Sequence, residues 1–210
     1  MRAAADPLGE DEFAAAMAAL GPFEPTPHLA VAVSGGADSL AAASLTARWL
    51  ATRGGRGTAL TVDHGLRPAS APEAGWVAAM AEKLGLAHRT LHWRRAADEP
   101  PSEARARAAR YRLLDEACGA LGCLHLVVAH HADDVAQTIA MRGRRGAGPG
   151  LAGIAAVREL DHARILRPLL AQSRARLRAT AAGCGFGWIE DPTNRDPRVE
   201  RTRIAPAVLV

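Results

Sequence analysis

Short apolar runs alternate with longer stretches of helical pattern along most of this 210-residue chain. The run Leu29-Ala-Val-Ala-Val33 is apolar throughout, as expected of a strand buried on both faces of a sheet. Alternation of this kind is typical of β-α-β units, in which helices connect parallel strands and cover the sheet. The sequence therefore predicts an α/β fold with a Rossmann-like parallel sheet of about five strands flanked by helices.

The boundaries of these elements follow from the pattern and from its Gly and Pro breaks. We expect strands over 29–33, 58–62, 88–93, 125–129 and 164–166, and a last extended piece over 187–189. We expect helices over 10–20, 40–52, 72–85, 102–121, 133–145 and 173–183. Ser102 has the residue type and position of a helix N-cap.

Composition and charge restrict the class of protein. The chain is 49% apolar and 23% charged, which is typical of a globular protein. Its three Cys form no CxxC pair, and no apolar stretch approaches the ~18 residues of a membrane span, so we expect a cytoplasmic protein that contacts no membrane. The net charge of +4 arises in residues 158–210, where ten Arg stand against six acidic residues. This excess suits a phosphate-rich partner, although a solvated basic face would give the same composition.

The segment Ser34-Gly-Gly-Ala-Asp-Ser39 lies between the first buried strand and a helix. Two Gly allow the backbone to approach an anion closely, and the free N–H groups of a helix N-terminus favour a phosphate. The spacing is neither that of a Walker loop nor GxGxxG. Asp38 would repel a phosphate unless a cation bridged them, so the loop predicts a nucleotide with Mg²⁺. The alternative is an ordinary helix start that Asp38 caps.

Other polar clusters also follow predicted strands, so they should meet at the carboxyl edge of the sheet. Asp63 and His64 follow the second strand, and His130-His-Ala-Asp-Asp134 follows the fourth. His131 and Asp134 are three residues apart and can share a helix face, whereas Asp133 and Asp134 are about 100° apart. A zinc site and simple helix capping are the alternatives for this cluster.

Two Arg lie three residues apart on one face of the predicted helix 102–121. Arg107 is the candidate for contacting a phosphate or a developing charge, with Arg110 beside it. A solvated helix face with Glu103 and Asp115 nearby is the alternative interpretation.

The Ser34–Ser39 loop resembles the PP-loop of the N-type ATP pyrophosphatases, and the motifs after it resemble those of the bacterial tRNA(Ile)-lysidine synthetases. These motifs occur in the family's order: Val62-Asp-His-Gly-Leu-Arg67, Ala106-Arg-Ala-Ala-Arg-Tyr111, Ala129-His-His-Ala-Asp-Asp134, Arg145-Gly-Ala-Gly148 and Trp188-Ile-Glu-Asp-Pro-Thr-Asn194. The resemblance implies an adenine-nucleotide α-hydrolase-like PP-loop domain over 28–195, after an N-terminal helix and lead-in over 1–27. Residues 196–210 would begin a helical segment, with the relatives' further tRNA-binding domains absent from this chain.

The resemblance also implies a reaction. ATP would adenylate the C2 oxygen of the wobble cytidine in an isoleucine tRNA with a CAU anticodon. The amine of free L-lysine would then displace AMP, giving lysidine, AMP and pyrophosphate. The partners would be this tRNA and lysine, the cofactors ATP and Mg²⁺, and whether the protein forms a homodimer stays open.

Residues that match the family's motifs take on the family's roles by this resemblance. The ATP-binding positions would be Ser34, Gly35, Gly36, Ala37, Asp38, Ser39, Asp63, His64, Arg145 and Gly146. The catalytic positions would be Asp38, Arg107, His131, Asp133 and Asp134. Asp38 and Asp134 would also hold Mg²⁺.

The chain departs from the family's pattern at three positions. Val135 and Gln137 stand where the family usually has Gln and Glu, and Ala147 stands where it has Ser. Gln137 keeps the shape of Glu without its charge, which weakens the expected affinity for metal or lysine. Two other functions therefore stay open. One is another PP-loop tRNA-modifying enzyme, although thiolating members need paired Cys; the other is a degenerate protein that binds ATP or tRNA without turnover.

Overall fold

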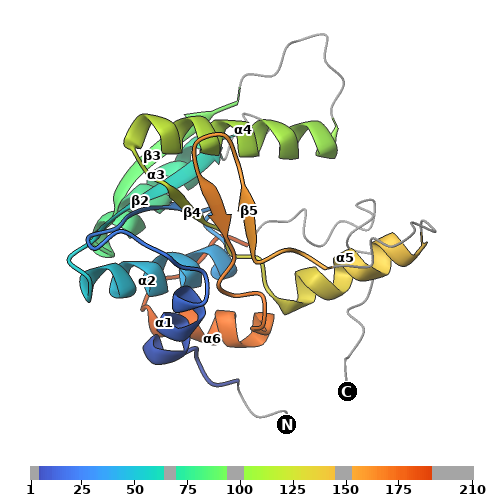
Figure 1. Cartoon of the computed structure of the whole chain (residues 1–210), viewed down its shortest axis with the longest axis horizontal. Helices are drawn as coiled ribbons and strands as arrows, with labels where there is room; N and C mark the ends of the chain where they lie inside the picture. The colour runs from blue at the N-terminus through green and yellow to red at the C-terminus, as the bar shows by residue number, and fades with distance from the viewer. Residues whose placement is uncertain (1–4, 64–69, 94–101, 145–152, 191–210) are drawn as a thin grey trace.

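The computed structural model describes residues 5–63, 70–93, 102–144 and 153–190, and these form one sheet covered by helices on both faces (Figure 1). The strands are β1 (His28–Ala32), β2 (Arg56–Asp63), β3 (Ala87–His92), β4 (His125–Val127), β5 (Val157–Glu159) and β6 (Arg164–Leu166). The helices are α1 (Glu10–Ala18), α2 (Ala37–Ala51), α3 (Ser70–Lys83), α4 (Glu103–Leu121), α5 (Ala132–Arg144) and α6 (Arg174–Gly183).

The sheet has the strand order β3-β2-β1-β4-β6-β5. All neighbouring strands are parallel except β5, which pairs antiparallel with β6. The predicted α/β class and the mostly parallel, Rossmann-like sheet are thus confirmed. The chain proceeds from β1 through β2 to β3 on one side of β1 and continues with β4 on its other side. The carboxyl ends of β1 and β4 therefore flank a switch point, where open α/β sheets bind ligands.

The sheet has six strands, where the sequence predicts about five. The additional strand β5 has only three residues, two of them charged, and therefore carries no apolar pattern. The predicted extended piece over 187–189 is not a strand of the sheet. Its Ile189 N–H instead donates to the carbonyl of Gly35, in the loop after β1 (N···O 2.9 Å).

Alternate residues of β1 serve two hydrophobic cores. Leu29 and Val31 pack with α1, α2, α3 and α6 on one face of the sheet. Ala30 and Ala32 pack with α4 on the opposite face, as Figure 1 shows. The small side chains on the α4 face let that helix approach the sheet closely. Within the described residues, no helix is both long and apolar enough to cross a membrane.

Candidate functional site

The loop between β1 and α2 is held open by hydrogen bonds to one hydroxyl. Ser39 Oγ donates to the carbonyl of Gly36 (2.9 Å) and accepts from the Ser34 N–H (3.2 Å). The Ser34 and Ser39 hydroxyls are also 3.2 Å apart. Gly36 is the N-cap of α2, so no side chain caps the N-terminal end of this helix. The first N–H groups of α2 are thus free of any capping side chain, an arrangement that suits a phosphate.

Position 35 can be occupied without strain only by glycine. Its φ of +87° lies in the left-handed region, and a Cβ there would lie 2.6 Å from Cδ1 of Ile189. The segment around Ile189 therefore packs directly on this loop. Trp188 and Glu190 order this segment further, because the Trp188 indole donates to Glu190 and Arg178 pairs with the same carboxylate (2.9 and 3.1 Å).

Three carboxylates surround one buried imidazole at the carboxyl edge of the sheet. His131 Nε2 lies 3.5 Å from Asp38 Oδ2 and 3.6 Å from Asp134 Oδ2, while its Nδ1 lies 3.3 Å from Asp133 Oδ2. The structure thus unites four of the five predicted catalytic residues. Asp133 and Asp134 do diverge along the helix, yet they reach opposite nitrogens of the same ring.

The electrostatics of this group favour a charged imidazole. Burial alone lowers the pKa of His131, but the hydrogen bond with Asp38 and the charges of Asp134, Asp38 and Asp133 raise it overall. An imidazolium here holds the three carboxylates together. Without its charge, they would repel one another across a few ångströms.

Asp133 and Asp134 each accept a hydrogen bond from a backbone N–H group at the start of a helix. Asp134 Oδ2 accepts from the backbone N–H of His131 (3.0 Å), which caps α5. Asp133 Oδ2 accepts from the backbone N–H of Arg174 (2.9 Å), at the first residue of α6. Helix capping, the alternative that the sequence left open, is therefore one of the roles of both residues.

Sequence reasoning missed the part that Arg174 plays. Its Nε lies 3.7 Å from Asp38 Oδ2, so α6 brings a cation to the PP-loop carboxylate. Arg176 and Arg178, on the same helix, pair with other acids, Arg176 with Glu12 at 2.7 Å and Arg178 with Glu190 at 3.1 Å.

Arg107 does not join the Asp38 group. Its guanidinium carbon lies 5.2 Å from the ring centroid of Tyr111 on the α4 side of the sheet. Asp63 ends β2, and its Oδ2 lies 3.5 Å from Nδ1 of His92 at the end of the neighbouring strand. His64, Arg145 and Gly146 lie outside the described residues.

Asp38 has one feature of a metal ligand. Its Oδ1 is buried and has no hydrogen-bond partner within the part of the chain that the structure describes. In the same part of the chain, no three His, Cys, Asp or Glu side chains form a group that could hold a metal ion. This geometry gives no support to a protein-only zinc site. It fits a Mg²⁺ ion that takes a single carboxylate and completes its shell with phosphate oxygens and water.

Comparison with known proteins identifies the domain. The PP-loop domain family matches residues 10–209. The tRNA(Ile)-lysidine synthase of Bradyrhizobium sp. strain BTAi1 is 50% identical over 189 residues, which are 87% of this chain and 52% of that protein. The one of Methylobacterium sp. strain 4-46 is 42% identical over 210 residues, 97% of this chain and 59% of that protein. The chain thus spans about half the length of the curated relatives it matches.

Solved structures share the fold at low sequence identity. A U34-tRNA thiolase from Methanococcus maripaludis superposes with a TM-score of 0.74 at 18% identity, over 87% of this chain and 66% of the thiolase. The NMN synthetase of Francisella tularensis gives 0.55 at 15% identity, over 85% and 71% of the two chains. At these identities the likeness concerns the fold alone.

Proposed function

Because this chain belongs to the PP-loop domain family, we propose that it uses ATP to join free L-lysine to C2 of the wobble cytidine of an isoleucine tRNA with a CAU anticodon. The products are lysidine, AMP and pyrophosphate. The observation that carries the proposal is the meeting of an uncapped phosphate loop with Asp38, His131, Asp133 and Asp134 at one sheet edge. The relatives that bear the same activity in their names match nearly the whole chain. We expect such a protein to act in the cytoplasm.

The PP-loop binds the triphosphate of ATP in this proposal. The N–H groups at the start of α2 and the hydroxyls of Ser34 and Ser39 donate to phosphate oxygens. Asp63, at the end of the adjacent strand, borders the nucleotide, together with His64, Arg145 and Gly146. These contacts hold the α-phosphorus near the C2 oxygen of the cytidine, so that positioning supplies much of the rate.

Asp38 is the residue that would hold Mg²⁺, through its buried and unpartnered Oδ1. Asp134 is the second candidate, although its Oδ2 also accepts the capping hydrogen bond at the start of its own helix, α5. When bound, the ion neutralises phosphate charge and supports the departure of pyrophosphate. His131 contacts both Asp38 and Asp134 through Nε2 and so holds the two carboxylates near each other.

Asp133 is our choice for the residue that meets the lysine ammonium. Its side chain is the most exposed of the three carboxylates, at 40% against 25% for Asp38 and 34% for Asp134. The amine must lose a proton before it attacks C2, and a carboxylate beside it can take that proton. Arg107 offers its positive charge from the α4 side of the sheet, which is the side opposite α2.

The thiolating alternative is disfavoured by the cysteines. Cys118 and Cys123 are buried, and burial raises the pKa of their thiols to about 12 and about 11. Thiols of this kind are poor nucleophiles and poor cluster ligands.

Pyrophosphate release tests the proposal. The purified chain is mixed with Mg²⁺-ATP and an isoleucine tRNA transcript bearing either CAU or GAU, with and without lysine. We expect release that requires the CAU transcript. ATP binding without any release, with either transcript, would instead identify a degenerate binding protein.

A further inference from the structure

Four arginines gather around one tyrosine on the α4 side of the sheet. The guanidinium carbons of Arg107, Arg110 and Arg158 lie 5.2, 5.8 and 5.8 Å from the ring centroid of Tyr111. They come from two elements far apart in sequence, since Arg107 and Arg110 belong to α4 and Arg158 to β5. With Arg167 they form what we call the arginine cluster.

Arg167 is the buried member of the arginine cluster. Its residue is 5% exposed, Nε donates to Nδ1 of His130 (3.0 Å), and Nη1 donates to the carbonyl of Ala155 (2.6 Å). Burial, followed by the charges of Arg167, Arg107 and Arg110, lowers the pKa of His130 to about 3. The imidazole is therefore neutral and can accept the Arg167 hydrogen bond. This contact fixes one cation of the cluster rigidly beneath the exposed ones.

Three of the four arginines in the cluster have no acidic partner among the described residues. Across the described ranges, no carboxylate forms an ion pair with Arg107, Arg158 or Arg167. The face of an aromatic ring attracts a guanidinium only modestly and does not cancel the repulsion among several. Arg107 and Arg158 are exposed, so an anion from solution can reach them. A phosphate fits best, because guanidinium groups donate to its oxygens in pairs.

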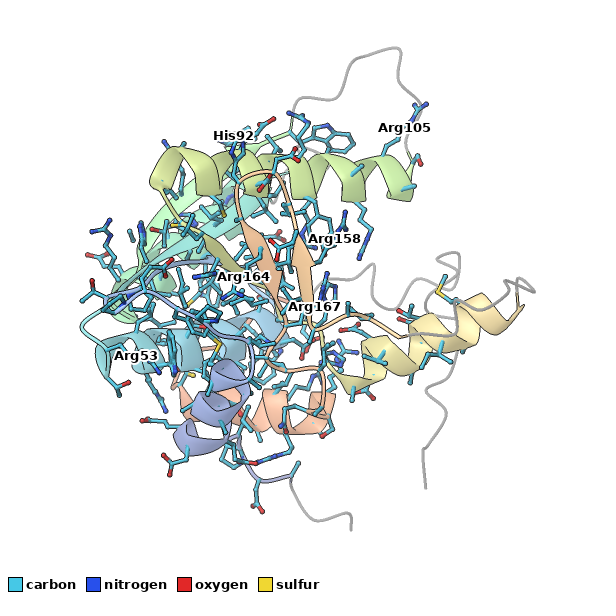
Figure 2. All side chains as sticks on the ribbon, viewed as in Figure 1. Arg53, His92, Arg105, Arg158, Arg164 and Arg167 are labelled. Atoms are coloured by element: carbon cyan, nitrogen blue, oxygen red, sulfur yellow. The ribbon has the colours of Figure 1, made fainter. Side chains whose placement is uncertain are left out.

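The location separates this cluster from the PP-loop. Tyr111 belongs to the hydrophobic core between the sheet and α4, whereas the PP-loop leads into α2 on the opposite face. Figure 2 shows Arg158 and Arg167 on the β5–β6 hairpin, well apart from Arg53 at the far side of the molecule. The PP-loop already provides for the triphosphate, so the second phosphate-bearing substrate is the better match for the cluster.

We propose that the arginine cluster binds a backbone phosphate of the tRNA and thereby orients the anticodon toward the PP-loop. This inference rests on the proposed function for the identity of the substrate. It adds Arg158 and Arg167 to the residues that the reaction uses. The β5–β6 hairpin becomes part of the tRNA-binding surface.

Arg158→Gln tests the inference, because it removes an exposed charge and keeps most of the aliphatic stem and the polarity of the side chain. Arg53→Gln is the matched control, since Arg53 also stacks on an aromatic ring, with its guanidinium carbon 4.5 Å from the centroid of Trp49. Binding of the CAU transcript is followed by fluorescence anisotropy without ATP or lysine, over a series of salt concentrations. The KM for ATP is measured separately.

We expect Arg158→Gln to weaken tRNA binding by about three- to tenfold at low salt and to reduce the salt slope by about 0.7 to 0.9, the value of one phosphate contact. Arg53→Gln should leave both unchanged, and neither variant should alter the KM for ATP. Equal tRNA affinity for the two variants would overturn the inference. A raised KM for ATP with normal tRNA binding would also overturn it and assign the cluster to ATP.

The failure of the proposed function would look different. Binding is measured without turnover, so a chain that needs Arg158 to bind the transcript and yet makes no lysidine would keep the inference and overturn the function. Absence of binding by the unaltered chain would overturn the inference, whatever the turnover assay gave.

Discussion

Asp38 is the residue on which the proposed chemistry depends most. Its Oδ1 is buried and makes no hydrogen bond within the described residues, so this atom does not serve as a helix cap there. We expect Asp38→Asn to reduce pyrophosphate release at least about 100-fold, because an amide cannot replace a carboxylate toward a cation. Asp11→Asn, on the exposed first turn of α1, should leave release unchanged. Normal turnover of Asp38→Asn would show that the residue serves only the helix start.

Substitution of Gly35 tests how closely Ile189 packs on the loop between β1 and α2. Gly35→Ala adds a Cβ at positive φ and at 2.6 Å from Ile189, whereas Gly54→Ala meets a positive φ of +60° with no atom within 4 Å. We expect Gly54→Ala to lower the free energy of unfolding by about 1 kcal/mol and Gly35→Ala by at least about 2 kcal/mol. Urea denaturation measures both. Equal losses would mean that Ile189 does not pack on the loop.

His130 should make the stability depend on pH. The folded chain keeps this imidazole neutral down to about pH 3, whereas the unfolded chain protonates it below about 6.5. The unfolded state therefore binds more protons in that window, and stability falls as the pH falls from 6.5 toward 3. We expect His130→Gln to reduce the loss of unfolding free energy between pH 7 and pH 5 by about 1 to 2 kcal/mol. Chemical denaturation at both pH values checks this, and an unchanged difference would contradict it.

At the residue scale, the sequence predicts only those features that residues adjacent in the chain determine. The PP-loop could be found because its Gly, Ser and Asp residues are contiguous. The contact of Arg174 with Asp38 joins residues 136 positions apart, and that of Arg167 with His130 joins residues 37 positions apart. Only the order of the strands brings these pairs together.

At the scale of elements, one carboxylate anchors the β5–β6 hairpin. Asp115 of α4 is buried and accepts from the backbone N–H groups of Asp161, His162 and Ala163, each at 3.1 Å. The alternative interpretation of this helix, a solvated face with Asp115 nearby, does not hold at Asp115, because the short β5–β6 hairpin covers it. This anchor holds Arg158 over α4.

Asp115→Ala removes all three of these acceptor contacts. We expect it to lower the free energy of unfolding by about 2 to 4 kcal/mol, since three backbone N–H groups, one of them buried, lose a charged partner. Glu116→Ala, which breaks only an exposed pair with Arg112, should cost at most about 0.5 kcal/mol. Thermal or urea unfolding of the two variants gives the comparison. Similar losses would mean that the hairpin does not depend on Asp115.

The parallel strands and most helices could be predicted because each carries its own pattern. The long buried run of β1 and the Ala-rich α2 are recognisable without any partner. Strand β5 needs β6 beside it, and the segment around Ile189 needs the PP-loop beneath it. Such elements are defined by tertiary contacts rather than by their residues.

At the scale of the whole molecule, the three thiols report on the integrity of both cores. Cys118 and Cys123 are buried with raised pKa values, and Cys184 is half-buried. We expect one thiol to react readily with a thiol reagent in the native protein and all three in denaturant. Cys184→Ser should abolish the fast reaction. Fast reaction of more than one thiol would contradict the packing between α4 and the sheet.

The distribution of charge over the whole molecule agrees with two phosphate-bearing substrates. One face of the sheet edge offers the start of α2 and the carboxylates around His131, and the other offers the arginine cluster. The two groups are linked at the end of β4, where His130 contacts Arg167 and His131 contacts Asp38. In our proposals, ATP and a tRNA phosphate bind on opposite sides of this point. The shape of the site follows from the strand order alone.

Incorporation of labelled lysine into the tRNA tests this account most directly. The chain is incubated with Mg²⁺-ATP, labelled L-lysine and the CAU transcript, and the wobble nucleoside is then isolated and weighed by mass spectrometry. The account predicts one lysine per tRNA at the wobble cytidine, with none in the GAU transcript. Consumption of ATP with no lysine in the tRNA would contradict it.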